Sequence, residues 1–71
     1  MFKVGQKVDV NLSIGGRKIT EKDGIVGEIF YSDVTGGDIV SVLVGGRKYW
    51  FYQNGRYWDS NTGSGYIEVQ R

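Results

Sequence analysis

The residues best suited to chemistry lie between positions 47 and 58, where six aromatic and three basic side chains are concentrated. Gly45-Gly46 and Asn54-Gly55 favour two-residue hairpin turns, because glycine and asparagine accept positive φ angles. With both turns in place, directly opposed residues share a face of the sheet. One face then carries an aromatic strip of Trp50, Tyr52 and Tyr57 beside Lys48, with Arg56 at the neighbouring turn.

This strip has the composition of a recognition surface. Tyrosine and tryptophan combine a large apolar ring with a polar group, and together with arginine they dominate the residues that contribute most to protein interfaces. The same face carries Ile39 and Leu43. The opposite face is more continuously apolar and β-branched, and we expect it to be the core, formed by Val40, Val42, Val44, Tyr49, Phe51 and Trp58.

The strip fits several kinds of partner, and it also has a purely structural interpretation. A protein partner, including a second copy of the chain, is the leading expectation. Nucleic acid is the alternative, because aromatics interleaved with Lys48 and Arg56 suit base stacking on a sheet, and carbohydrate is a third. In the structural interpretation, the strip is covered within the monomer by the polar loop 60–65.

The charge balance argues against a dedicated nucleic-acid-binding protein. Nine basic and eight acidic residues give a net charge of +1, whereas neutralising phosphates supplies much of the affinity of such proteins. Two basic pairs, Arg17-Lys18 and Arg47-Lys48, follow the expected hairpin tips. They could contact phosphates, but the low net charge favours solubilising charges that protect sheet edges.

Residues for catalysis or metal binding are scarce. The chain has no histidine and no cysteine, which removes the commonest general base and the thiolate nucleophile. The segment from Asp59 to Gln70 begins like a calcium loop, but it has Gly63 at the fifth position and Gln70 where the closing glutamate belongs. We therefore expect no enzymatic activity, no catalytic residue, no bound metal and no cofactor.

The elements that must position the strip are short antiparallel strands. Val8, Val10, Leu12 and Ile14 alternate with polar residues, as in a strand with one buried face. Gly15-Gly16 then predicts a hairpin that pairs Ile14 with Arg17 and Leu12 with Ile19. Further strands are expected over five ranges, separated by loops at 33–38 and 60–65: 25–32, 39–44, 47–53, 56–59 and 66–70.

Twelve glycines and no proline agree with tight turns between strands whose backbone N–H groups all remain free to pair. Gly27 lies inside an expected strand and predicts a bulge or a close backbone approach. No stretch has helical periodicity, so we expect no helix longer than one turn. The prediction is one all-β domain, residues 1–71, with five to seven short antiparallel strands that curl to protect their edges.

Two short motifs give this order of elements a family resemblance. The segment Val4-Gly5-Gln6-Lys7-Val8-Asp9-Val10 is similar to the first strand of SH3-like barrels of the KOW and Tudor type, and Gly24-Ile25-Val26-Gly27-Glu28-Ile29 looks like their Gly-x-x-Gly-x-Val core. The resemblance spans residues 3–52 and implies a small SH3-like β-barrel. The chain lacks the motifs with which eukaryotic SH3 domains bind proline-rich peptides.

The sequence also predicts a soluble protein. The first residues lack the long apolar stretch of a signal peptide, and no apolar run approaches the roughly 20 residues that a membrane-spanning helix needs. The absence of cysteine fits a reducing compartment. We expect a cytoplasmic location and no contact with membranes, with self-association as a further source of buried surface for so small a domain.

Overall fold

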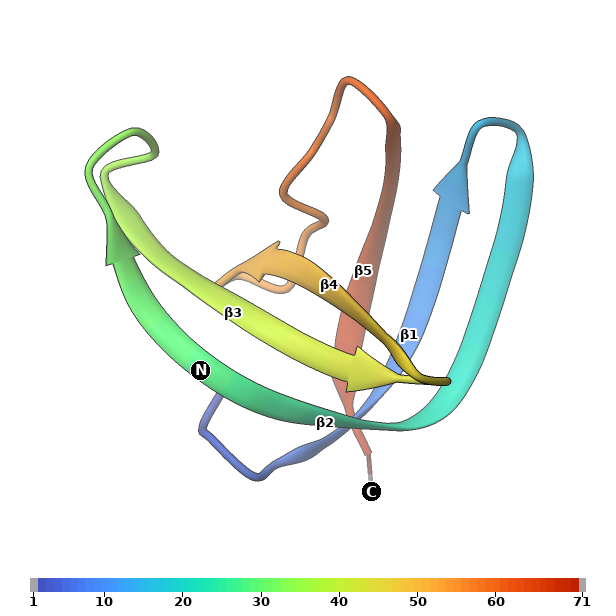
Figure 1. The fold of residues 1–71 in the computed structure, drawn as a ribbon, viewed down its shortest axis with the longest axis horizontal. Helices are drawn as coiled ribbons and strands as arrows, with labels where there is room; N and C mark the ends of the chain where they lie inside the picture. Colours follow the sequence, from blue (N-terminus) through green and yellow to red (C-terminus); the bar gives the residue numbers. More distant parts are fainter. Residues whose placement is uncertain (1, 71) are drawn as a thin grey trace.

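A computed structural model describes residues 2–70, which form one antiparallel sheet without a helix (Figure 1). The strands are β1 Lys7–Ile14, β2 Arg17–Ser32, β3 Gly37–Val44, β4 Arg47–Tyr52 and β5 Gly63–Val69. Their order in the sheet is β4-β3-β2-β1-β5. The expected all-β class is confirmed. In residues 2–70 no helix is long and apolar enough to cross a membrane.

Two of the expected glycine turns reverse the chain in two residues, as predicted. Ile14 pairs with Arg17 across Gly15-Gly16, and Val44 pairs with Arg47 across Gly45-Gly46. All four glycines have positive φ angles, between 57° and 76°. Positive angles are required in the type of two-residue turn whose twist matches that of the flanking strands. These turns fix the register of β1 with β2 and of β3 with β4.

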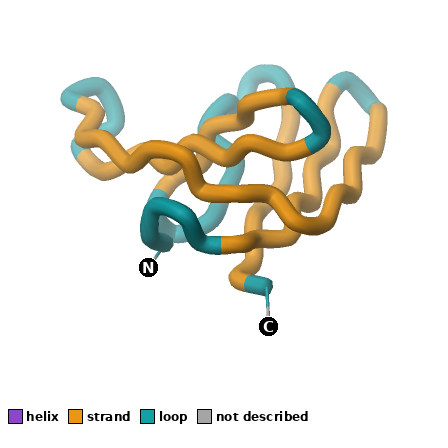
Figure 2. The backbone as a smooth tube through the Cα atoms, turned by 60° about the horizontal axis from the view of Figure 1, so that its bottom comes forward, coloured by secondary structure: helices purple, strands orange, loops and turns teal. Residues whose placement is uncertain are grey.

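Strand β2 is one continuous element, where the sequence suggested two strands. Its first half pairs with β1 and its second half with β3, so the strand bends between two parts of the sheet (Figure 2). Register shifts occur at Val8/Val10 and at Val26/Glu28, on either side of the bend, and Asp23 has a positive φ of 64°. Irregularities of this kind increase twist and curvature. The bulge expected near Gly27 is therefore present.

The bend brings the two edges of the sheet toward each other, but β4 and β5 do not pair directly. The segment 55–58 lies between them and bonds to both. On one side the N–H of Tyr52 donates to the carbonyl of Arg56 at 2.8 Å; on the other, the N–H of Tyr57 donates to the carbonyl of Gly65 at 2.9 Å. The five strands thus form an open sheet, and this segment occupies the space between its edges.

The core lies on the concave side of the curved sheet and consists mostly of valines. Phe51 has no exposed surface and is the largest of the fully buried side chains. Alternation places every second residue of β1 and β3 in this cluster. Its buried members are Val8, Val10, Leu12, Val26, Val40, Val42, Val44, Phe51 and Ile67.

Strand β5 begins at Gly63, within a segment expected to be a loop. The glycines Gly63 and Gly65 allow it to approach β1 closely. A Cβ atom on Gly65 would collide with the carbonyl oxygen of Asn11 and approach the Leu12 side chain to 2.7 Å. The expected loop 60–65 was therefore too long at its C-terminal end. Two glycines in a polar segment indicate a loop in the sequence, but here the strand needs them for its close approach to β1.

This close approach makes Gly65 essential to the sheet. We expect Gly65→Ala to lower the free energy of unfolding by about 2–4 kcal/mol, since β5 must move away from β1 to admit the methyl group. The matched control is Gly37→Ala, whose Cβ would have open space around it and should change stability by less than about 0.5 kcal/mol. Urea denaturation followed by circular dichroism measures both. Equal effects of the two variants would contradict the close approach.

Candidate functional site

The turn at Asn54-Gly55 does not have the predicted length. The N–H of Gly55 donates to the carbonyl of Tyr52 at 2.9 Å, and the N–H of Tyr52 donates to the carbonyl of Arg56. Three residues, 53–55, therefore separate the paired Tyr52 and Arg56. Gly55 has a φ of 93°, as expected for the last residue of a three-residue hairpin loop. The Asn54 side chain stabilises the turn by accepting the N–H of Arg56 at 2.9 Å.

One extra residue in the turn shifts the register, and a shift of one residue exchanges the two faces of a strand. Tyr57 pairs with Phe51, and the N–H of Trp58 donates to the carbonyl of Trp50 at 3.0 Å. Tyr57 packs against the core, where its ring meets Phe51 edge to face at 5.7 Å. Tyr57 was wrongly predicted on the strip and Trp58 wrongly predicted in the core.

The corrected register creates an outer apolar face over β2, β3 and β4. We define it as Phe30, Leu43, Trp50, Tyr52 and Trp58. Phe30 and Tyr52 flank Ile39 on β3, and Trp50 flanks Ser41. Phe30, Leu43, Trp50 and Trp58 are 44%, 48%, 41% and 42% exposed, while Ile39 between Phe30 and Tyr52 is only 3% exposed. Large apolar side chains therefore share one wet face of the sheet.

A polar cluster lies within the outer apolar face. The bulge at Gly27 frees the N–H of Glu28 from the regular ladder, and it donates instead to the hydroxyl of Ser41 at 2.9 Å. Ser41 is buried, with 1% exposure. Above it, Lys48 Nζ lies 3.6 Å from the Glu28 carboxylate. Because both side chains are largely exposed, the ion pair adds orientation rather than stability.

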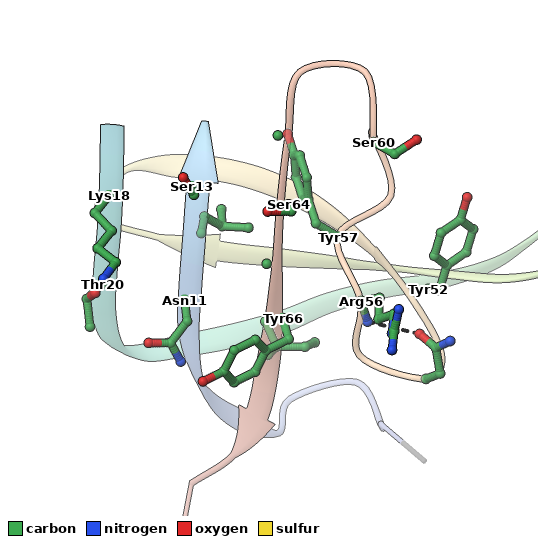
Figure 3. A pocket seen from close by; sticks show the side chains of 15 residues that line it. Asn11, Ser13, Lys18, Thr20, Tyr52, Arg56, Tyr57, Ser60, Ser64 and Tyr66 are labelled. Carbon is green, nitrogen blue, oxygen red and sulfur yellow. Dashed lines mark hydrogen bonds between the residues drawn. The ribbon is translucent and has the colours of Figure 1, made fainter. Parts of the chain in front are cut away.

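A second surface, the polar groove, runs over β1 and β5 to the segment 56–57 (Figure 3), and most of its polar side chains lie on the outward side of these strands. Its side chains form rows across the strands, because residues that pair between neighbouring strands point to the same face of the sheet. Asn11 pairs with Thr20 on one side and Tyr66 on the other, and Tyr66 in turn pairs with Arg56. The next row is Lys18, Ser13 and Ser64. Tyr52 and Tyr57 also line the groove.

The charged side chains that line the groove are all positive. Its described lining residues include the cations Lys18 and Arg56 but no aspartate or glutamate. The carboxylates next to the groove lie outside its lining: Asp9 pairs with Glu68 on the same face as Asn11 and Tyr66, and Asp59 precedes the lining residue Ser60. In a chain with nearly balanced charge, this distribution produces a local positive potential between hydroxyl and amide groups.

The predicted site residues therefore divide between two surfaces. Lys48, Trp50 and Tyr52 lie on the outer face of β4, whereas Arg56 and Tyr57 belong to the polar groove. Tyr52 touches both, because its strand ends where the groove begins. On the first surface, sequence reasoning placed Leu43 correctly but missed Phe30. On the second it missed Tyr66, although the alternation in 66–70 placed this residue opposite the buried Ile67.

Among residues 2–70, no group of three or more acidic side chains is placed to hold a metal ion. No family model, curated protein or solved structure matches the chain. The two surfaces must therefore be interpreted from their own chemistry.

The corrected register has a direct test in the paired variants Tyr57→Ala and Trp58→Ala. Tyr57 packs on the core and Trp58 faces water, so we expect Tyr57→Ala to cost about 2–4 kcal/mol of unfolding free energy and Trp58→Ala less than about 1 kcal/mol. Chemical denaturation of both variants gives the two values. The reverse order would restore the two-residue turn and overturn the assignment of faces.

Proposed function

We propose that this chain is a non-catalytic binding module that recognises another protein through the outer apolar face. The observation behind the proposal is the exposure of four large apolar side chains, two of them tryptophans, on the same face as an already buried Ile39. Soluble monomers rarely leave such side chains contiguous and exposed unless something covers them.

The composition of this face favours a protein partner. Tryptophan, tyrosine and phenylalanine are enriched at the centres of protein interfaces, while charged residues are concentrated at their rims. The face has the aromatic members of this pattern, but its one ion pair, Lys48 with Glu28, lies over Ser41 within the face. That pair can donate and accept hydrogen bonds to a partner's backbone at little cost, because it is already exposed.

The fold supports a finer structural inference as part of the same proposal. Strands β1 to β4 pair consecutively and β5 returns to pair with β1. Together with the bent β2 and the bonds of segment 55–58 to both sheet edges, this order fits a small SH3-like barrel in which the segment takes the closing position. Closure protects edge strands from pairing with other chains. Binding would then take place on side chains of the outer face rather than by addition of a strand.

The test uses the two tryptophans as reporters, because both lie on the proposed surface and the chain has no others. Peptides selected from a random displayed library on the purified protein should shift the tryptophan emission to shorter wavelength when they bind. The double variant Phe30→Ser, Trp50→Ser should weaken their binding by at least about 30-fold, as loss of a central aromatic contact costs 2 kcal/mol or more. Titration by fluorescence anisotropy of labelled peptides measures the affinity.

The matched control is Tyr31→Ser. Tyr31 is an exposed aromatic on the same strand, 64% accessible, but it points to the opposite side from Phe30. It should leave the affinity within about twofold, as expected for a residue outside the interface. Sedimentation of the protein alone over a wide concentration range shows whether the partner is a second copy. Peptides that bind the double variant as tightly as the original chain would refute the proposal, as would the absence of both peptide binding and self-association.

A further inference from the structure

The polar groove carries a second inference, independent of the outer apolar face. We propose that it binds a short single-stranded nucleic acid, with Lys18 and Arg56 contacting phosphates and Tyr66 stacking on a base. Tyr52 is the one residue that both lines the groove and belongs to the outer apolar face, whereas Phe30 and Trp50 lie outside the groove's lining.

Charge is the first argument for an anionic ligand. Both charged residues that line the groove are cations, and the described lining contains no carboxylate. A neutral sugar would gain from carboxylate acceptors for its hydroxyl groups, and a basic peptide would be repelled. A polyanion gains from two cations in a lining without carboxylates, because its counterions are released on binding.

Geometry is the second argument. Thr20, Asn11, Tyr66 and Arg56 form one row across neighbouring chain segments. Three steps of ~4.8 Å between neighbours separate the ends of this row by about 14 Å. Lys18 lies one row further along the same face. The two cations thus stand on either side of the tyrosine, as required for a backbone that passes over a stacked base.

Tyr66 distinguishes nucleic acid from an acidic peptide. Its side chain is 47% exposed and extends from β5 toward Asn11 on β1 (Figure 3). A base gains about 1–3 kcal/mol by stacking on an exposed aromatic ring, with little dependence on sequence. The neighbouring amide of Asn11 and hydroxyls of Ser13, Thr20 and Ser64 add hydrogen bonds that a phosphate, sugar or base edge can accept or donate. An acidic peptide would gain no such stacking energy, because aspartate and glutamate side chains have no ring to stack on Tyr66.

The carboxylates below the groove limit the length of the ligand. Asp9 and Glu68 form the next row on the same face, and their charges repel phosphates that continue in that direction. The strand must therefore run across the sheet between Lys18 and Arg56 rather than along β1. A site of this width holds a few nucleotides, at the lower end of the range for small β-barrel binders.

The experiment is a titration of fluorescein-labelled oligo(dT) with the whole chain at low salt, followed by anisotropy. With two phosphates neutralised, the affinity should fall about sevenfold for a fourfold rise in salt. Tyr66→Ala should weaken binding at least about fivefold, whereas Tyr66→Phe, which keeps the ring, should stay within about twofold. Arg56→Gln and Lys18→Gln should each weaken binding and reduce the salt dependence.

The control with the same change of charge is Arg47→Gln, an exposed residue at the start of β4 that does not line the groove, and this variant should bind like the original chain. The double variant Phe30→Ser, Trp50→Ser should also bind DNA normally, so that failure here and failure of the protein-binding proposal remain distinguishable. The inference is overturned if oligo(dT) does not bind, if duplex DNA or poly-L-glutamate binds as tightly, or if Tyr66→Ala has no effect. Circular dichroism verifies that each variant is folded.

Discussion

The three-residue turn at 53–55 is the constraint on which both surfaces depend. Its register decides that Tyr57 faces the core and Trp58 faces water. The same turn closes the space between the sheet edges, since the carbonyl of Gly55 accepts the N–H of Ile67 at 2.8 Å. A Cβ on Gly55 would approach the Ile67 carbonyl to 3.0 Å. Positive φ and close approach thus both require glycine at this position, and a longer or shorter turn would rearrange the aromatic side chains as a group.

Local signals in the sequence were sufficient for much of the fold. Alternation identified β1 and its partner, and the glycine pairs gave two correct registers because a two-residue turn leaves the pairing no freedom. Those registers placed Val40, Val42, Val44 and Phe51 correctly in the core. Gly27 gave the bulge through its position inside a strand. Each of these inferences involved residues close together in the chain, where turn chemistry and periodicity act directly.

The errors arose where distant segments decide the structure. Asn-Gly is compatible with two-residue and three-residue turns, and the choice here follows from the bonds of segment 55–58 to β4 on one side and β5 on the other. In the sequence, Gly63 and Gly65 indicate a loop. Their role in a strand becomes evident only from the close approach of β1. The polar groove is formed by the first hairpin and the last strand, which are distant in the sequence. No local pattern therefore predicts that its cations and Tyr66 lie close together.

The distribution of aromatic residues connects the fold with the two proposed surfaces. The chain has two tryptophans, five tyrosines and three phenylalanines, yet Phe51 is the single aromatic that is fully buried in residues 2–70. Valines fill most of the remaining core. A domain of this size has little apolar area to spare, and burying more rings would stabilise it by roughly 1.5–3 kcal/mol each. Phe2, Tyr49 and Tyr57 pack against this core, whereas Phe30, Trp50, Trp58 and Tyr66 stay exposed on the sheet. A monomer gains little from these exposed rings, and the ligands proposed for the two surfaces would gain stabilisation by covering them.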